Sequence, residues 1–379
     1  MKHRKILIVA GEVSGDRHAA DLVAAIKKKI PDIDFVGIGG LHLQNEGVKL
    51  LYNISQLAIL GFVEILKHIP LIRKVFRDIK KEAIREIDAA ILVDYPGFNL
   101  RLAKMLTKQG IPVIYYICPQ MWAWGENRIK KFRKFVDLPL VIFKFEEVFF
   151  DKHGLKAYFV GHPLVDQLPQ RSNESEFRQK YNVAPNKKII GLFPGSREIE
   201  VKRLLPLMVD SIKELMKERD VIPMIAKASH LDNNLYNKYL SNSEEFKLII
   251  SDIHQLMQVS HVALVASGTA TLELGYLRTP SIVLYAVSPL TYWIGRSLVK
   301  IKNIALANIV MGKTVFPEFI QQEANKRNIL GALNKLFTDE HYYENIQNEL
   351  IRIKEILGEP GATNRAAELI VNFMSSESS

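Results

Sequence analysis

The stretch Lys5–Asp16, KILIVAGEVSGD, contains the transition that decides the fold. An apolar run over residues 5–10 ends at Gly11, and a helical pattern follows from about Arg17 to Ile30, before Pro31. A short uninterrupted apolar run is typical of a strand that is buried on both faces of a parallel sheet. The two glycines of the connection allow a tight turn, and the helix start offers free N–H groups to an anion.

The same alternation of strand and helix repeats along the chain. A polar, proline-containing stretch at 161–187 separates two sets of predicted strands, which lie at 5–10, 35–38, 89–93, 113–117, 138–142 and 157–160, and at 188–193, 222–226, 247–250, 262–266 and 282–285. Strands that alternate with helices predict βαβ units. We therefore expect an α/β protein with two Rossmann-like, doubly wound parallel-sheet domains that face a cleft. The predicted domains are 1–165 and 180–340, followed by C-terminal helices at 341–379.

Composition narrows the class of protein. The 379 residues are 48% hydrophobic and carry a formal net charge of +10, so the chain is globular and suited to an anionic partner. Its single cysteine, Cys118, excludes an intrachain disulfide and a cysteine metal cluster, and suits a reducing compartment. Neither a signal-peptide core nor an apolar stretch of ~18 residues is present, so we expect a cytoplasmic chain without a membrane span.

Ligands of open α/β sheets bind beyond the carboxyl ends of the strands, so the residues at these ends are the candidates for chemistry. In the first domain, DYPGFN places Asp94 directly after a buried strand, where partial burial would raise its pKa toward that of a general base. The alternative is that Asp94 or Asn99 caps the next helix. The later motif CPQMWAWG contains two tryptophans that could stack on a sugar or pack against acyl chains, or else belong to the core.

Two strand ends of the second domain favour a phosphate ligand. FPGSRE places Gly195, Ser196 and Arg197 between a strand and a helix, and the arginine adds charge to the helix start. SGTATLE repeats this arrangement with Ser267, Gly268 and Thr269. Glu273, about one turn into that helix, could reach ribose hydroxyls or simply favour the helix dipole. Two such sites in one domain suggest a nucleoside diphosphate.

Other cofactor classes are disfavoured. The first turn is not G-x-G-x-x-G, and the second strand ends in Gly39-Gly40 without the acidic residue that binds an NAD ribose. No P-loop pattern occurs, which argues against ATP hydrolysis. His18 and His162 could face the cleft, but we interpret both as structural or solvated residues.

Taken together, the motifs resemble the lipid-A-disaccharide synthase family of inverting glycosyltransferases. They are GEVSGD, LGFVEIL (60–66), DYPGFN, CPQMWAWG, GHPLVD (161–166), LFPGSR, SGTATLE and the segment that ends LANIVMG, in the same order over most of the chain. Some members carry an acid at the Gly97 position and a serine at the Cys118 position. The resemblance implies a glycosyltransferase-B fold, with final helices that return to the first domain and can be exchanged in a homodimer.

The resemblance also implies a reaction. The 6-hydroxyl of 2,3-diacylglucosamine 1-phosphate attacks C1 of UDP-2,3-diacylglucosamine, giving a β-1,6-linked lipid A disaccharide phosphate and UDP. Asp94 is the first candidate for the base, and Glu12 is the second candidate or orients the acceptor. Arg197 and the helix start at Ser267–Thr269 would stabilise the leaving UDP, Glu273 would hold the ribose, and Asn308 matches a position near the nucleotide. No Asp-x-Asp motif is present, so we expect neither a metal ion nor another cofactor.

Residues 62–81, FVEILKHIPLIRKVFRDIKK, combine an apolar face with a basic one. By itself this pattern favours a surface helix packed on the sheet, but lipid substrates favour contact with an anionic bilayer. We therefore expect a peripheral protein at the inner face of the cytoplasmic membrane. The predicted contact residues are Phe62, Leu66, Ile69, Ile72, Arg73 and Lys74, with residues 128–134 and 293–302 as further basic and aromatic candidates.

Two alternatives remain from the sequence. The first is another UDP-sugar enzyme of the same fold, either an epimerase or a transferase that acts on soluble sugars. The second is a nucleic-acid-binding module that explains the basic charge, although no recognised nucleic-acid motif accompanies the basic segments. The lipid-facing pattern at 62–81 favours the lipid enzyme over both, and we expect no nucleic-acid partner.

Overall fold

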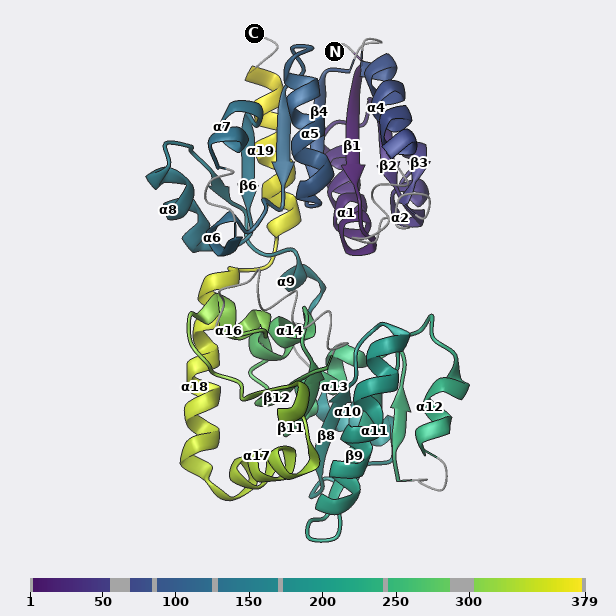
Figure 1. Ribbon diagram of the computed structural model, residues 1–379, viewed down its shortest axis with the longest axis vertical. Coiled ribbons are helices and arrows are strands. Elements are labelled where there is room, and N and C mark those ends of the chain that lie inside the picture. Colours follow the sequence, from purple (N-terminus) through teal and green to yellow (C-terminus); the bar gives the residue numbers. More distant parts are fainter. Residues whose placement is uncertain are drawn as a thin grey trace. The chain divides into compact units, whose positions relative to one another are not determined.

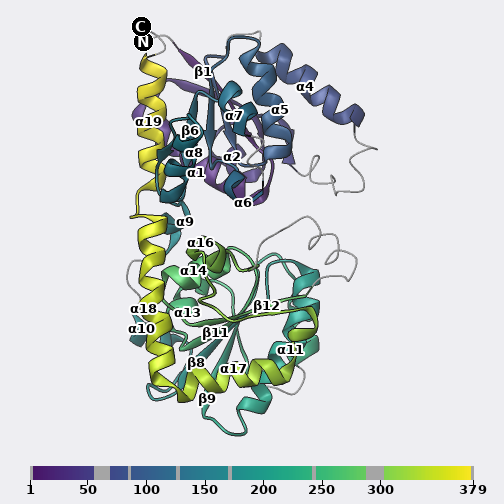
Figure 2. The ribbon, with the colours of Figure 1, turned by 60° about the vertical axis from the view of Figure 1, so that its left-hand side comes forward.

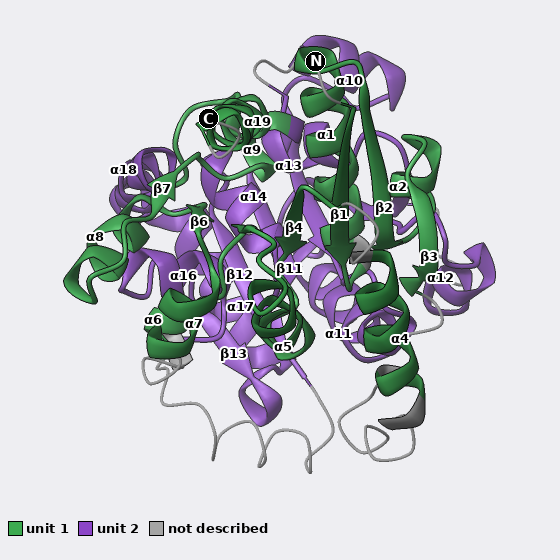
Figure 3. Cartoon of the chain, turned by 90° about the horizontal axis from the view of Figure 1, so that it is seen from above, with its two compact units in different colours: residues 1–166, 357–379 green, residues 167–356 purple. Residues whose placement is uncertain are grey.

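The computed structural model divides into two compact units, residues 1–166 with 357–379, and residues 167–356 (Figure 3). The structure describes residues 3–54, 69–83, 87–124, 129–169, 173–240, 245–286 and 303–376. The segment predicted as C-terminal helices is thereby divided, because α18 (Glu340–Leu357) lies almost wholly in the second unit and α19 (Ala362–Ser376) lies in the first.

The first unit is built on a parallel sheet in the order β3-β2-β1-β4-β5-β6-β7. The strands are β1 (Arg4–Ala10), β2 (Ile33–Gly39), β3 (Lys49–Asn53), β4 (Ala89–Val93), β5 (Val113–Tyr116), β6 (Leu138–Val141) and β7 (Tyr158–Phe159). The helices are α1 (Val13–Lys29), α2 (Leu41–Asn45), α4 (Ile69–Ala83), α5 (Pro96–Thr107), α6 (Met121–Trp124), α7 (Ile129–Phe135), α8 (Lys144–Lys152) and α9 (Leu164–Gln167), together with α19.

Helices cover both faces of this sheet, as the apolar strands require. Alternate strand residues such as Leu7, Leu92 and Tyr115 form one core with buried residues of α4, α5 and α7. On the other face α19 packs against α1 and reaches β6 (Figure 1). The carboxylate of Asp166 accepts hydrogen bonds from N–H groups at the start of α19, including those of Gly361 (2.5 Å), just before the helix, and Thr363 (3.0 Å). This contact fixes the start of the returning helix.

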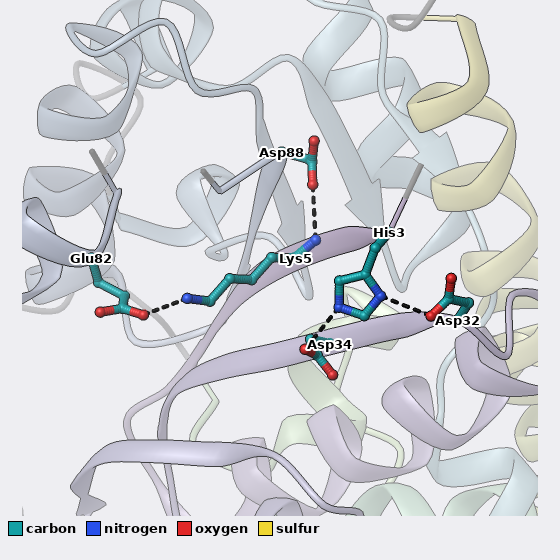
Figure 4. A network of polar contacts seen from close by, with 6 residues as sticks. All are labelled: His3, Lys5, Asp32, Asp34, Glu82 and Asp88. Atoms are coloured by element: carbon teal, nitrogen blue, oxygen red, sulfur yellow. Dashed lines mark hydrogen bonds and ion pairs between the residues drawn. The ribbon is translucent and has the colours of Figure 1, made fainter. Parts of the chain in front are cut away.

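A network of polar contacts joins the strands at the amino-terminal edge of the first sheet (Figure 4). The ring nitrogens of His3 lie 2.7 Å from an Asp32 carboxylate oxygen and 2.9 Å from one of Asp34. The backbone N–H of Lys5 donates to the Asp88 carboxylate at 2.8 Å. These contacts connect the start of β1 with β2 and with the residue that precedes β4. They lie at the other end of the strands from the carboxyl ends.

The second unit is built on a parallel sheet in the order β10-β9-β8-β11-β12-β13. Its strands are β8 (Lys188–Phe193), β9 (Val221–Ala226), β10 (Lys247–Ile249), β11 (Val262–Ala266), β12 (Ser281–Tyr285) and β13 (Glu318–Ile320). The helices are α10 (Glu174–Lys180), α11 (Glu198–Leu215), α12 (Asn233–Leu240), α13 (Ile253–Val259), α14 (Ala270–Tyr276), α16 (Leu306–Met311) and α17 (Lys326–Thr338), the 3-10 turn η2 (Gln321–Glu323), and α18. Figure 2 shows α11 on one side of β8 and β11, with α13 and α14 on the other.

Candidate active site

In the first unit, the motifs predicted from the sequence follow two adjacent strands. β1 pairs directly with β4, and the strand order reverses between them, so the loops after both strands lie at one switch point of the sheet. An added Cβ on Gly11 would lie 2.2 Å from Cδ1 of the Tyr95 ring. Only glycine therefore allows the loop after β1 to lie against the loop after β4.

The turn after β4 has a strained backbone. Asp94 and Tyr95 have φ angles of 46° and 49°, in the left-handed region that non-glycine residues rarely occupy. Two side chains hold this turn through the Asp94 carbonyl, which accepts from the Tyr115 hydroxyl at 2.6 Å and from the Asn99 amide at 2.8 Å. Asn99 also donates to the Val93 carbonyl at 3.1 Å. Strain that neighbouring groups maintain in this way is typical of functional sites.

The surroundings of the Asp94 carboxyl group raise its affinity for a proton. Burial and, to a smaller extent, the negative charge of Glu12 raise its pKa to about 6, although a hydrogen bond from the Tyr95 N–H opposes both effects. Asp94 does not cap the following helix, since Tyr95 occupies the N-cap position of α5 without a side-chain hydrogen bond. The structure therefore brings the two predicted carboxylates, Asp94 and Glu12, close enough to interact, and Glu12 is the more exposed of them.

The final residue of GEVSGD has a structural role. Asp16 is 1% exposed, and its carboxylate accepts from the N–H groups of Gly40 at 2.6 Å and His42 at 3.0 Å, at the start of α2. The Gly39-Gly40 pair fits this contact, because a Cβ on either residue would lie within 3 Å of the Asp16 carboxylate. The helix start after β2 thus binds a carboxylate of the chain itself.

The two histidines considered from the sequence lie near each other and are neutral. Burial and, to a smaller extent, the nearby His18 lower the pKa of His162 to about 3. The ring nitrogen Nδ1 of His162 accepts from the Leu164 N–H at 3.1 Å. Burial also lowers the pKa of His18, whose Nδ1 has no hydrogen-bond partner among the described residues.

Trp122 belongs to a packed aromatic cluster, so the core interpretation holds for this residue. Its indole N–H donates to Oε1 of Glu146 at 3.0 Å, and its ring packs edge-on against Phe145. Glu146 is fully buried, and its other oxygen accepts from the N–H groups of Ile142 and Phe143. Burial raises the pKa of Glu146 to about 7. The sequence patterns did not single out Glu146, although a glutamate at the third position of a helix often accepts from the N-cap N–H, as it does here from Phe143.

The second unit has a switch point of its own, where β8 pairs with β11. The loop after β8 is closed by Glu200, whose carboxylate accepts from the N–H groups of Ser196 and Arg197 at 3.2 Å each. Gly195 has a φ of 108°, and a Cβ there would lie 2.3 Å from that carboxylate. The Arg197 side chain is 80% exposed and contacts Glu200 at 3.4 Å. Glu200 therefore caps the backbone at the start of α11, while the Arg197 guanidinium remains accessible.

The loop after β11 presents Gly268 and Thr269 at the surface. The Ser267 hydroxyl is engaged within the chain, since it donates to the Ile304 carbonyl at 3.0 Å. Glu273, in the first turn of α14, lies 3.6 Å from Nε2 of His254 on α13. His254, which sequence analysis missed, therefore stands beside the predicted ribose-binding carboxylate. Because β8 and β11 are neighbours, this loop and the Arg197 loop share one edge of the sheet.

Asn308 is fully buried and holds its segment together. Its amide nitrogen donates to the Phe316 carbonyl at 2.8 Å and to the Glu318 carboxylate at 2.7 Å. Its amide oxygen accepts from the N–H groups of Val315 and Phe316. Since these contacts use both ends of the amide, Asn308 shapes residues 303–318 rather than offering a free amide to a ligand.

A buried cation, Lys227, follows β9 at the same edge of the second sheet. It is 4% exposed, its ammonium donates to the Ala228 carbonyl at 3.3 Å, and it lies 5.9 Å from the centroid of the Tyr236 ring. No carboxylate pairs with it among the described residues. Sequence analysis missed Lys227, although a lysine directly after an apolar strand was a usable signal.

The predicted membrane segment is only partly described. Phe62 and Leu66 lie outside the described residues, as do the side chains of Ile69 and Ile72 and all of residues 293–302. In the described part of α4, Val75 and Ile79 are fully buried in the core of the first sheet. Arg73 and Lys74 are exposed. This part of the helix therefore matches the surface-helix interpretation, with a basic face toward solvent.

The described ranges show neither a metal-binding cluster nor a membrane-spanning helix. They contain no group of three or more His, Cys, Asp and Glu side chains that could hold a metal ion. In the same ranges, every helix falls short of the length and apolar character required to cross a bilayer.

Comparison with known proteins gives the family. A family model described as lipid-A-disaccharide synthetase matches residues 6–372. The chain belongs to the lipid-A-disaccharide synthase family. The lipid-A-disaccharide synthase of Myxococcus xanthus is 37% identical over 373 residues, covering 98% of this chain and 97% of that protein. The lipid-A-disaccharide synthase of Trichlorobacter lovleyi is 38% identical over 377 residues, covering 98% of both.

Solved structures support the fold class. The calicheamicin glycosyltransferase CalG4 matches with a TM-score of 0.66 at 12% identity and covers 100% of both chains. UDP-GlcNAc 2-epimerase from Neisseria meningitidis, solved with UDP-GlcNAc, matches with a TM-score of 0.58 at 16% identity and covers 98% of this chain and 100% of that chain. The predicted family, the glycosyltransferase-B class and the assignment as a glycosyltransferase are confirmed.

Proposed function

We propose that this lipid-A-disaccharide synthase family member transfers 2,3-diacylglucosamine from UDP-2,3-diacylglucosamine to the 6-hydroxyl of 2,3-diacylglucosamine 1-phosphate. The products are the β-1,6-linked disaccharide 1-phosphate and UDP. The observation that carries the proposal is the strained Asp94 turn, where a carboxyl group with a pKa of about 6 lies at the switch point of the first sheet. Family membership supplies the substrate class.

Asp94 is the proposed general base. Its carboxylate takes the proton from the acceptor 6-hydroxyl as O6 forms a bond to C1 of the donor, while the bond from C1 to the β-phosphate oxygen breaks and its electron pair leaves with UDP. A pKa near 6 leaves the group ionised at neutral pH and still basic enough for proton transfer. Glu12, on the neighbouring loop, sustains that pKa and is the proposed contact for the acceptor hydroxyls.

The second unit is the proposed binding site for UDP. Gly195, Ser196 and the exposed guanidinium of Arg197 would contact the diphosphate, with Ser267, Gly268 and Thr269 at the next strand end. Arg197 can leave Glu200, because their contact is long at 3.4 Å and the guanidinium is mostly in solvent. Glu273 would bind the ribose, and Asn308 would act by shaping the segment beside the nucleotide. Negative charge that grows on the leaving diphosphate would be stabilised by Arg197.

Lipid substrates require the enzyme to meet a bilayer, so we propose peripheral contact with the inner face of the cytoplasmic membrane through residues 62–74, with Arg73 and Lys74 facing anionic headgroups. The site needs no metal ion or cofactor in this scheme. A homodimer that exchanges C-terminal helices is also proposed on the family resemblance.

Incubation with both substrates tests the proposal. We expect UDP and a disaccharide 1-phosphate in equal amounts, and an undiminished rate in EDTA. Omission of the acceptor should leave the donor unchanged, which separates the proposed transferase from a hydrolase or an epimerase. Release of UDP without disaccharide, or an epimerised donor, would refute the proposed reaction.

A further inference from the structure

A pocket of about 510 Å³ opens at the amino-terminal edge of the second sheet, at the other end of the strands from the proposed UDP site. It lies where β8, β11 and β12 begin, and residues of α10, α13 and α18 complete its lining. Its volume is within the range of pockets that bind small molecules. No step of the proposed transfer uses this pocket.

The charges of the lining favour an anion. Four cations, Arg178, Lys187, Lys188 and Arg278, line the pocket against one acid, Glu174. Two of the cations have carboxylate partners, because Arg178 pairs with Glu174 at 2.8 Å and Lys187 pairs with Asp220 at 2.8 Å. Lys188 and Arg278 have none among the described residues.

Lys188 is held at the pocket by neutral groups. Its ammonium lies 3.1 Å from Nε2 of His261 and 5.2 Å from the centroid of the Phe337 ring. Burial and the charge of Lys188 lower the pKa of His261 to about 4, so the imidazole accepts from the ammonium and adds no charge of its own. His261 is fixed by stacking on Tyr343 of α18, with ring centroids 4.6 Å apart. The positive charge of Lys188 is therefore not neutralised by these neighbours and can bind an anionic ligand.

Arg278 is a second, independent sign of a binding role. It follows α14 with a φ of 60°, at a helix end where the left-handed conformation normally selects glycine. Its Nε donates to the Gln347 carbonyl at 3.3 Å, which orients the guanidinium, while its two Nη groups have no partner in the described part of the chain. A strained arginine with unused donors is better explained by a ligand than by local structure alone.

We propose that this pocket binds a small soluble phosphorylated molecule, with its phosphoryl group between Lys188 and Arg278. A phosphoryl group supplies the acceptor oxygens that an ammonium and a guanidinium lack within the chain. The polar lining, which includes the Gln258 amide, suits a ligand with hydroxyl groups rather than an acyl chain.

Titration calorimetry of the full chain with inorganic pyrophosphate tests this assignment. The titration is made at constant ionic strength in the presence of saturating UDP, so that the Arg197 loop is blocked. We expect 1:1 binding that Arg278→Gly and Lys188→Gln each weaken at least about tenfold. Arg278→Gly is well suited to the test, because glycine accepts the left-handed backbone and the variant should fold.

Three controls keep the result specific. Lys213→Gln removes an exposed cation of α11 outside the pocket and should bind as the parent chain does. Arg197→Ala should also retain this binding, which makes the outcome independent of the proposed transfer. Glycerol 3-phosphate should compete with pyrophosphate, whereas vesicles that contain phosphatidic acid should not. Absence of binding, equal affinity in the pocket variants, or competition by the vesicles alone would overturn the proposal.

Discussion

The pKa of the Asp94 carboxyl group depends on the geometry of the turn after β4. Two consecutive left-handed residues place its carboxyl group beside Glu12, and Asn99 and Tyr115 hold the carbonyl of the same residue. The sequence predicted a carboxylate at a strand end and the pKa rise that burial causes. It could not predict the left-handed turn, because a non-glycine residue rarely has a positive φ, and tyrosine is not among the residues enriched there.

Replacement of Asp94 by asparagine should abolish turnover and stabilise the fold. The folded pKa of about 6 lies above the ordinary aspartate value of 3.8, so the ionised carboxylate costs free energy at neutral pH. That cost is absent below pH 3.8, grows as the pH rises through 6, and is constant above it. We expect Asp94→Asn to raise the free energy of unfolding by about 1–3 kcal/mol at pH 8. Denaturant melts at pH 8 and pH 4 check this; an equal gain at both values would contradict it.

Gly11 offers a test of the contact between the loops that follow β1 and β4. Gly11→Ala places a Cβ 2.2 Å from the Tyr95 ring, which must move. We expect a loss of about 1–3 kcal/mol in stability, by the cost of overpacking, and a large loss of kcat. Gly97→Ala is the matched control, since nothing lies within 4 Å of its Cβ. Similar unfolding midpoints for the two variants would show that the Gly11 loop does not need close approach.

At the scale of elements, the sequence predicted buried strands better than edges. Residues 188–193 and 262–266 are strands with the predicted bounds, because both are continuous apolar runs. β3 (Lys49–Asn53) was missed, since it is a partly exposed edge strand whose sequence, KLLYN, lacks that signal. The final helices were found by their periodicity, but their division between the units depends on long-range contacts such as those between α19 and α1.

The start of α19 should depend on Asp166. Asp166→Ala removes the acceptor for the N–H groups of Gly361, Ala362 and Thr363. By the usual cost of a lost cap, we expect about 1–2 kcal/mol less stability and faster hydrogen exchange over residues 361–366. Exchange mass spectrometry measures this directly. Asp210→Ala, an exposed carboxylate within α11, is the control, and equal protection of α19 in both variants would rule out the capping role.

The basic face of α4 can be tested separately from its apolar face. Arg73→Glu with Lys74→Glu reverses two exposed charges and leaves the buried Val75 and Ile79 in place. Each lost cation should cost about 1 kcal/mol of attraction to an anionic surface, so we expect more than tenfold weaker binding to phosphatidylglycerol vesicles. Lys104→Glu with Lys108→Glu, exposed on and beside α5, is the matched control. Equal losses in both variants would indicate general charge rather than a docking face.

At the scale of the whole molecule, the positive side chains behind the net charge of +10 are distributed over several sites. Arg197 is exposed beside the proposed diphosphate site, Arg73 and Lys74 face solvent on α4, and Lys188 and Arg278 line the pocket at the opposite edge of the second sheet. The sequence predicted the first two. It could not predict the pocket, because its residues come from segments between 174 and 347 that only the fold brings together.

The pH dependence of kcat/KM for disaccharide formation tests the central claim that Asp94 is the base. The account predicts a rate that falls about tenfold per pH unit below an apparent pKa near 6, because the protonated carboxyl group cannot accept the hydroxyl proton. Replacement of Glu12 by glutamine should move that limb to lower pH, since the Glu12 charge helps to raise the pKa of Asp94. A profile that stays flat down to pH 5 would contradict the account.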